Sequence, residues 1–221
     1  VFAIDVNTQS EPEYVSNFVV DWAFHRNVSY ADNFESYARA LGPVKLELNT
    51  SSAESANTAA VFDFMDGWGD NLANDTNYRS WMFRRAAGFF DVATYTGNGT
   101  AGRTVTHNLA STPEFIIARN RDIVEDWTCY HGTPGATKYI QLNGVSGEQT
   151  LSTIWNNTAP TSTNFTVGTQ DRVNGNNYDY VAYLFATLTG ISKVGSYTGT
   201  GSNIGVDCGF TAGARFVLIK R

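Results

Sequence analysis

Several segments of the chain alternate apolar and polar residues with a period of two. In residues 18–26 every second position from Phe18 to Phe24 is apolar, and residues 44–49 repeat the pattern. This period is that of a half-buried β-strand, whose successive side chains point to opposite faces. The same template predicts further strands at residues 91–96, 103–106, 115–119, 138–142, 180–186 and 193–198.

Turn residues separate these segments. Gly97-Asn98-Gly99 and Gly199-Thr200-Gly201 supply glycines that tolerate positive φ. One helix is predicted from residue 30 to residue 41, with Ser29 as its cap and Gly42-Pro43 as its end. Its apolar positions stand at helical spacing: Tyr30, Phe34, Tyr37, Ala38 and Leu41. The pattern therefore predicts an all-β protein with one short helix.

An internal repeat organises the chain. Residues 78–99 align without a gap with residues 180–201, at an offset of 102 positions. Shorter matches join residues 45–49 to residues 138–143, and Asp21-Trp22 to Asp126-Trp127. Such a period indicates tandem β-sandwich-like repeats of about 100 residues. We predict three parts: a partial or divergent repeat at 1–87, a complete β-sandwich repeat at 88–189, and the start of a further repeat at 190–221.

The last part ends on the apolar run Phe216-Val217-Leu218-Ile219. A strand there would leave part of its sheet missing. We therefore expect the polypeptide to continue beyond residue 221, and the alternative is that another chain supplies the missing strands.

Composition and charge remove several classes of function. The 221 residues include 42% hydrophobic and 14% aromatic residues, which suffices for packed cores. The net charge is −6 and Lys and Arg form no stripe, so a nucleic-acid footprint is not expected. No segment approaches the roughly 20 apolar residues of a membrane span, so membrane insertion is not expected. Two cysteines, Cys129 and Cys208, do not make a disulfide scaffold.

A resemblance to a known family covers residues 88–221, and residues 15–87 more weakly. The tracts that carry it are GFFDVATYTGNGTAGRTVTHNLASTPEFIIARNR, DWTCYHGTPGATKYIQLN, WNNTAPTSTNFTVGT and YVAYLFATLTGISKVGSYTGTG. They resemble a repeat of virion proteins of tailed bacteriophages, especially marine phages, found in large tail-fibre and other structural proteins. The weaker part matches through DWAFHRN, VKLELNTSSAE and YRSWMFRRAAGFFDV.

The resemblance implies a structural component of the virion, a tail-fibre or spike protein involved in host-surface attachment. Its expected partners are further copies of itself, as a homotrimer, other virion proteins, and a host cell-surface glycan or protein. It carries over no catalytic residues. The alternatives are a phage-borne glycan depolymerase, a head-fibre or capsid decoration protein, and a monomeric secreted lectin.

Aromatic residues near predicted loops and strand ends are the candidates for glycan contact, because sugars stack their C–H faces on aromatic rings. The alternative is that they belong to the core, which the match of Trp127 to Trp22 favours for Trp127. The candidates are Trp68, Trp127, Tyr130 and Trp155.

One acidic, glycine-containing segment is a candidate calcium site. Asp63, Asp66 and Asp70 lie in VFDFMDGWGDN, and carboxylates with interleaved glycines can wrap Ca²⁺. The alternative is a turn-rich loop whose Asp side chains bond their own backbone. No other cofactor is expected. Cys129 and His131 share a strand face, but they lack the second close pair that zinc sites usually have.

An enzymatic function is not expected. Glycan hydrolysis needs two carboxyl groups about 5–10 Å apart in a cleft, and no sequence spacing here brings a pair together. No Ser/His/Asp signature occurs either. The available carboxylates are Glu11, Glu13, Asp21, Glu35, Glu114, Asp122, Glu125 and Asp126.

Overall fold

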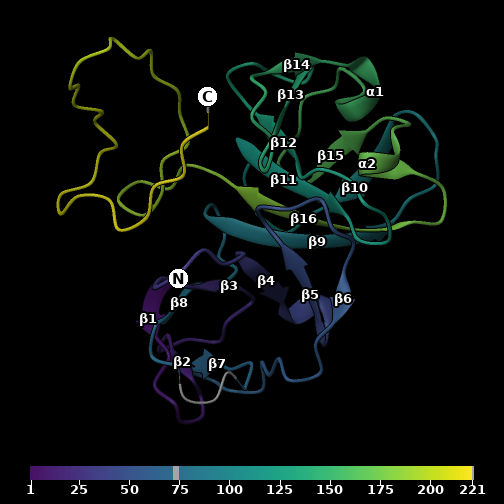
Figure 1. Cartoon of the computed structure of the whole chain (residues 1–221). Helices are drawn as coiled ribbons and strands as arrows, with labels where there is room; N and C mark the ends of the chain where they lie inside the picture. The colour runs from purple at the N-terminus through teal and green to yellow at the C-terminus, as the bar shows by residue number, and fades with distance from the viewer. Residues whose placement is uncertain (72–74, 221) are drawn as a thin grey trace.

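The computed structural model describes residues 1–71 and 75–220, and its architecture is nearly all β. Helices in these residues are limited to the 3-10 helix η1 (Arg39–Leu41) and to α1 (Ser152–Trp155) and α2 (Asp171–Asn174). None of them has the length and hydrophobicity that crossing a membrane requires. The all-β prediction is confirmed. The strands form two similar halves, and in Figure 1 the N-terminal half lies below the second half.

The N-terminal half, called unit 1 below, is a six-stranded antiparallel sheet in the order β1–β8–β3–β4–β5–β6. A two-stranded sheet of β2 and β7 packs on its outer face, where Tyr14 and Trp68 join Ala23, Tyr37 and Met82 in one core cluster. The strands are β1 (Phe2–Val6), β2 (Tyr14–Val15), β3 (Trp22–Asn27), β4 (Glu35–Ala38), β5 (Val44–Glu47), β6 (Ser55–Ala56), β7 (Gly67–Trp68) and β8 (Tyr78–Phe83).

The second half, unit 2, is a six-stranded antiparallel sheet in the order β14–β13–β12–β11–β16–β9. A two-stranded sheet of β10 and β15, with α1 and α2, covers its outer face. The predicted strands near 91–96, 103–106, 115–119, 138–142 and 180–186 are confirmed within one residue at each end. The strands are β9 (Phe90–Thr96), β10 (Arg103–Thr106), β11 (Phe115–Asn120), β12 (Thr128–His131), β13 (Lys138–Gln141), β14 (Gln149–Thr150), β15 (Asn164–Val167) and β16 (Asp179–Phe185).

Strand register confirms the main repeat alignment and corrects a minor one. Phe83 of β8 lies opposite Trp22 of β3, and Phe185 of β16 lies opposite Phe115 of β11. Phe83 and Phe185 are therefore equivalent, as the offset of 102 predicts. Trp22 corresponds to Phe115, so the predicted match of Asp21-Trp22 to Asp126-Trp127 is wrong. A two-residue match carries little information against the pairing of a whole strand.

The two large sheets pack face to face through a shared aromatic core. Trp22 of unit 1 stacks on Tyr183 of unit 2 with ring centroids 4.4 Å apart, and the equivalent residues Phe83 and Phe185 contact each other at 6.0 Å. The same face of each sheet thus points to the other, as in an isologous dimer. This mutual burial explains why β16, Asp179–Phe185, is apolar on both faces.

The predicted helix at residues 30–41 is wrong. Residues 35–38 form strand β4, which pairs with β3 on one side and β5 on the other, and only the three residues of η1 are helical. Helical spacing of aromatic residues was outweighed by two strand neighbours that bury Tyr37 and Ala38 completely.

The predicted strand at residues 193–198 is also wrong. Its counterpart in unit 2 is β9, which pairs with β16, whereas within the described residues no strand pairs with residues 193–198. Described residues 186–220 contain one isolated bridge, Leu188 to Ser192, and no longer strand. Residues 216–219 are 39–64% exposed, although Phe216 contacts Phe2 of β1. The three-part division of the chain stays a prediction.

Candidate functional site

The four aromatic residues predicted to contact glycan are core residues, and that prediction is wrong. None of them is more than 5% exposed. Trp68 lies under the small sheet of unit 1, Trp127 lies between the two large sheets, and Tyr130 packs edge-on against Trp155 in unit 2. Sugar stacking requires an open ring face, and no such face is present on these residues.

The predicted calcium ligands do not come together either. Asp63 and Asp66 are exposed, whereas Asp70 is buried. Among the described residues, the one cluster of three candidate metal ligands consists of His25, Glu35 and Asp70. Asp70 therefore belongs to a buried site that also includes residues of β3 and β4, and Asp63 and Asp66 are not part of that site.

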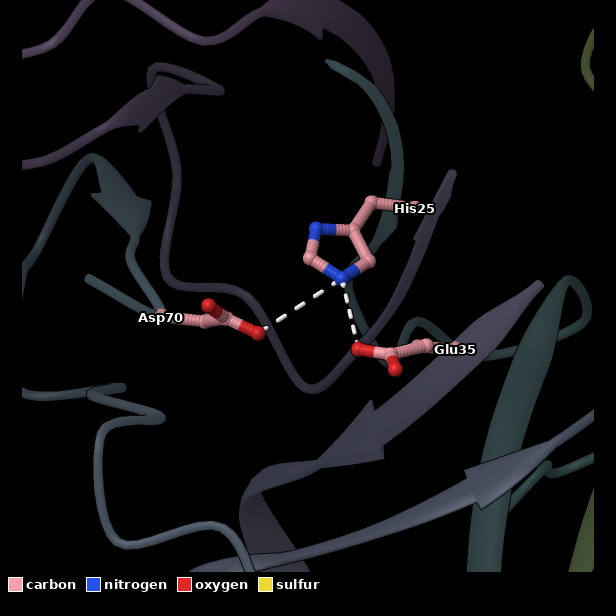
Figure 2. Close-up of side chains that lie close together, drawn as sticks. All are labelled: His25, Glu35 and Asp70. Atoms are coloured by element: carbon pink, nitrogen blue, oxygen red, sulfur yellow. Dashed lines mark hydrogen bonds and ion pairs between the residues drawn. The ribbon is translucent and has the colours of Figure 1, made fainter. Parts of the chain in front are cut away.

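Strand pairing and a neighbouring turn position this cluster (Figure 2). His25 of β3 lies directly opposite Glu35 of β4 in the sheet. Asp70 follows β7, which pairs with β2 through Trp68 and Tyr14. The backbone N–H of Asp70 donates to Glu13 Oε2 at 2.8 Å, which anchors the turn over the outer face of the sheet.

One imidazole nitrogen faces both carboxylates. His25 Nε2 lies 3.3 Å from Glu35 Oε2 and 3.5 Å from Asp70 Oδ2. The side chain of His25 has no exposed surface, that of Asp70 is 2% exposed, and that of Glu35 is 23% exposed. The cluster is therefore enclosed, and of its three side chains Glu35 is the one that is partly exposed to solvent.

Neighbouring polar groups orient the cluster. The Tyr14 hydroxyl lies 3.1 Å from His25 Nδ1, which fixes the imidazole ring. The Tyr37 hydroxyl donates to Glu35 Oε2 at 2.7 Å, and the Lys45 ammonium forms an ion pair with Glu35 Oε1. Asn57 Nδ2 donates to the Tyr37 hydroxyl at 3.0 Å and contacts Asp70 Oδ2 at 3.4 Å.

Aromatic rings enclose the imidazole. Their centroids lie 5.2–5.9 Å from that of His25, and the nearest is Tyr78. The indole N–H of Trp68 is satisfied by Ser80 Oγ at 2.9 Å. A wall of this kind lowers the local dielectric and strengthens each charge interaction inside it. The four rings are those of Tyr14, Tyr37, Trp68 and Tyr78.

Burial and hydrogen bonds shift the pKa values of the two carboxyl groups in opposite directions. Burial raises the pKa of Glu35, but the hydrogen bonds from His25, Lys45 and Tyr37 outweigh it and lower that pKa to about 2. Burial raises the pKa of Asp70 despite the opposing effects of His25 and Tyr37. Burial likewise raises the pKa of Tyr37, so its hydroxyl remains a donor.

The arrangement brings one nitrogen and two oxygens to a common point. Chemically, it can hold a divalent cation, or it can form an ion pair of a protonated imidazole with two carboxylates. A cavity of about 450 Å³ lies elsewhere, where the two units meet, and its lining includes none of the three residues. This cavity therefore does not serve the cluster.

From the sequence alone, His25 is one of three histidines and Glu35 is one of several carboxylates, with nothing to connect them. The available signal was the alternation in β3, which places His25 on the same face as Ala23, opposite to Trp22 and Phe24. Because β3 is buried on both faces, that histidine lies in a core. Asp70 could not be paired with it by spacing.

Comparison with known proteins gives one family. A family model described as a domain of unknown function (DUF7483) matches residues 67–221, which include β7, β8 and all strands of unit 2. His25 and Glu35 lie before the matched residues, and Asp70 lies within them. The searches of curated proteins and of solved structures gave no significant match.

Proposed function

The chain belongs to the DUF7483 family, and we propose that it is a structural component of a bacteriophage virion. Its place is a tail fibre or spike that takes part in attachment to the host surface. The observation that carries the proposal is the pairing of two units through equivalent faces, together with the resemblance of residues 88–221 to virion repeats. Tandem units that bury each other's faces are the building principle of extended proteins.

Exposed apolar side chains support assembly beyond the pair. Residues 216–219 expose a run of apolar side chains, and the edge strand β1 exposes Ile4 and Val6 by 44% and 37%. An unpaired edge with exposed β-branched residues is a template for another strand. We propose that other copies of the chain, in a homotrimer, or other virion proteins cover these surfaces.

The inter-unit cavity is the observation on which a glycan depolymerase would rest. It contains two carboxylates, Asp21 and Asp91. Asp21 already binds Arg85, with Oδ1 3.1 Å from Nε, and Asp91 Oδ2 accepts the backbone N–H of Asn108 at 2.6 Å. Both carboxylates thus have structural partners, which favours the structural function over hydrolysis.

Labelling of intact particles tests the proposal. Antibodies raised against the chain, coupled to gold, should mark the tail in regular copies, and electron cryomicroscopy should show the paired sheets in the labelled feature. Absence of the chain from purified particles would refute the proposal. Incubation with host envelope polysaccharide tests the alternative, because release of oligosaccharides that depends on Asp21 and Asp91 would establish a depolymerase instead.

A further inference from the structure

We propose that His25, Glu35 and Asp70 bind a divalent metal ion of the zinc class, which holds the small sheet of unit 1 to its large sheet. The ligand atoms are His25 Nε2, Glu35 Oε2 and Asp70 Oδ2. Two of these residues lie on neighbouring strands, and the third lies in the turn after β7. The ion would be a cross-link within the unit, and this inference does not depend on the function proposed above.

The two distances from His25 Nε2 fit shared coordination better than direct hydrogen bonding. Nε2 lies 3.3 Å and 3.5 Å from the two oxygens. Hydrogen bonds between nitrogen and oxygen are usually about 2.7–3.2 Å long. Zinc bonds of about 2.0–2.1 Å place tetrahedral ligands about 3.3–3.4 Å from one another, which matches the observed spacing.

The surrounding groups leave the required lone pairs free. If Nδ1 of His25 donates its proton to the Tyr14 hydroxyl, at 3.1 Å, then Nε2 carries a lone pair toward the carboxylates. Lys45 occupies Oε1 of Glu35, and the Tyr37 hydroxyl takes one lone pair of Oε2, which leaves the other lone pair of Oε2 for the ion. Partners of this kind orient the ligands of established metal sites.

The charge of the enclosed region also calls for a cation. Glu13 and Asp70 are each less than 5% exposed, and Glu35 faces both His25 and Tyr37. Among the described residues, Lys45 is the one ammonium that forms an ion pair with these carboxylates. Buried carboxylates are costly unless a positive charge balances them, and a divalent ion supplies that balance.

The donor set selects the class of ion. Calcium and magnesium take oxygen ligands, whereas an imidazole with carboxylates suits zinc and related first-row ions. Three protein donors are present, one nitrogen and two oxygens. Because His25 and Asp70 are enclosed by aromatic rings, the ion would be structural.

Unit 2 shows that the fold itself does not require these residues. Ala118 occupies the register position of His25, opposite Ala182 instead of Ser80. Thr128 occupies that of Glu35, opposite Gln141 where Glu35 lies opposite Glu47. The same sheet therefore closes over apolar and small side chains, and the ionisable cluster is an addition to it.

The test measures metal in the whole chain. After removal of metals with a chelator, the chain should take up one Zn²⁺ per molecule, and Co²⁺ in its place should give the visible absorption of a four-coordinate site. Zinc should raise the melting temperature, whereas Ca²⁺ at the same concentration should not. Failure of the wild-type chain to bind either Zn²⁺ or Co²⁺ overturns the inference, and so does preferential binding of Ca²⁺.

Variants locate the ion. His25→Gln and Asp70→Asn should abolish stoichiometric binding, and Tyr14→Phe should weaken it by about 10-fold because the ring loses its orienting partner. His131→Gln, at a histidine on the other unit, is the matched control and should bind as the wild type does. Zinc retained by a folded His25→Gln chain would place the ion elsewhere and refute the site. If that variant does not fold, the site is tested by the Zn²⁺ affinity of Tyr14→Phe and by the Co²⁺ spectrum of the wild type. An unchanged affinity in Tyr14→Phe, or a spectrum without four-coordinate absorption, would refute it.

Discussion

The two units share one strand order but fill the space beneath their small sheets differently. In unit 1 this space holds His25, Glu35 and Asp70 with their tyrosine and lysine partners. In unit 2 the corresponding core cluster contains Ile154, Trp155 and Phe165. One topology thus accepts either an ionisable network or a hydrocarbon core. The strand order does not determine the chemistry of the core.

The difference extends to what covers the sheet. Unit 2 has α1 and α2, which bury Ile154, Trp155 and Val173. No helix stands in their place within the described residues of unit 1, where the turn carrying Asp70 is held by polar contacts to Glu13 and Asn57. Polar contacts are directional, whereas apolar burial is not. The turn that carries Asp70 therefore depends on a few defined atoms, whereas α1 and α2 are also held by the burial of apolar side chains.

The largest expected effect lies where the units meet. Trp22→Ala removes a ring that contacts Phe24 and Phe83 in unit 1 and Phe90 and Tyr183 in unit 2. We expect a loss of about 3–5 kcal/mol in the free energy of unfolding, as for other buried aromatic side chains. Hydrogen exchange should speed up in both β3 of unit 1 and β16 of unit 2, because Trp22 lies on β3 and Tyr183 on β16.

Trp155→Ala serves as the control for Trp22→Ala, because Trp155 packs within unit 2 alone. Its additional exchange should be confined to unit 2. An equal distribution of exchange in the two variants would contradict the shared core.

The next effect concerns the ionisable cluster itself. His25→Ala leaves Glu35 and Asp70 facing each other without the imidazole, and we expect a cost of about 3 kcal/mol in chelator-treated protein. The matched change in unit 2, Ala118→Gly, should cost only about 1 kcal/mol, since it affects backbone entropy and a methyl group. Urea unfolding measures both. Equal costs would mean that the cluster contributes no more than ordinary packing.

A smaller effect is expected for two residues that occupy equivalent positions in the two large sheets. Ser36 and Cys129 occupy the same register position, and Ser36 Oγ accepts the indole N–H of Trp22 at 2.9 Å. Ser36→Cys weakens that bond, and Cys129→Ser buries a hydroxyl in an apolar setting. Each swap should cost about 1–3 kcal/mol in thermal unfolding. A swap that leaves stability unchanged would show that the two sites are interchangeable.

The smallest effect leaves stability untouched. Burial raises the pKa of Cys129 to about 12, whereas Cys208 is half-buried in the C-terminal segment. Because the thiolate is the reactive form, iodoacetamide should modify Cys208 in the native protein and Cys129 only after unfolding. Mass spectrometry of the labelled chain measures this. Comparable rates at the two cysteines would indicate that the sheets separate readily.

The sequence by itself determined the class of fold and the repeat. Period-two alternation is a local property of each strand, so β9, β10, β11, β13 and β16 were predictable to within one residue at each end. The offset of 102 was also reliable, because β8 and β16 are equivalent central strands with the same burial demands. Local propensity failed at residues 30–41, where two neighbouring strands impose an extended chain on aromatic residues at helical spacing.

Only the tertiary structure decided which side chains meet. His25, Glu35 and Asp70 are brought together by strand register and by a turn that Glu13 anchors, and neither is encoded in the spacing of the three residues. The same holds for Trp68 and Trp155, which lie in loop-like sequence contexts but are buried by the small sheets and helices. Burial depends on the packing of distant segments, and for that reason a local pattern predicts strands better than it predicts sites.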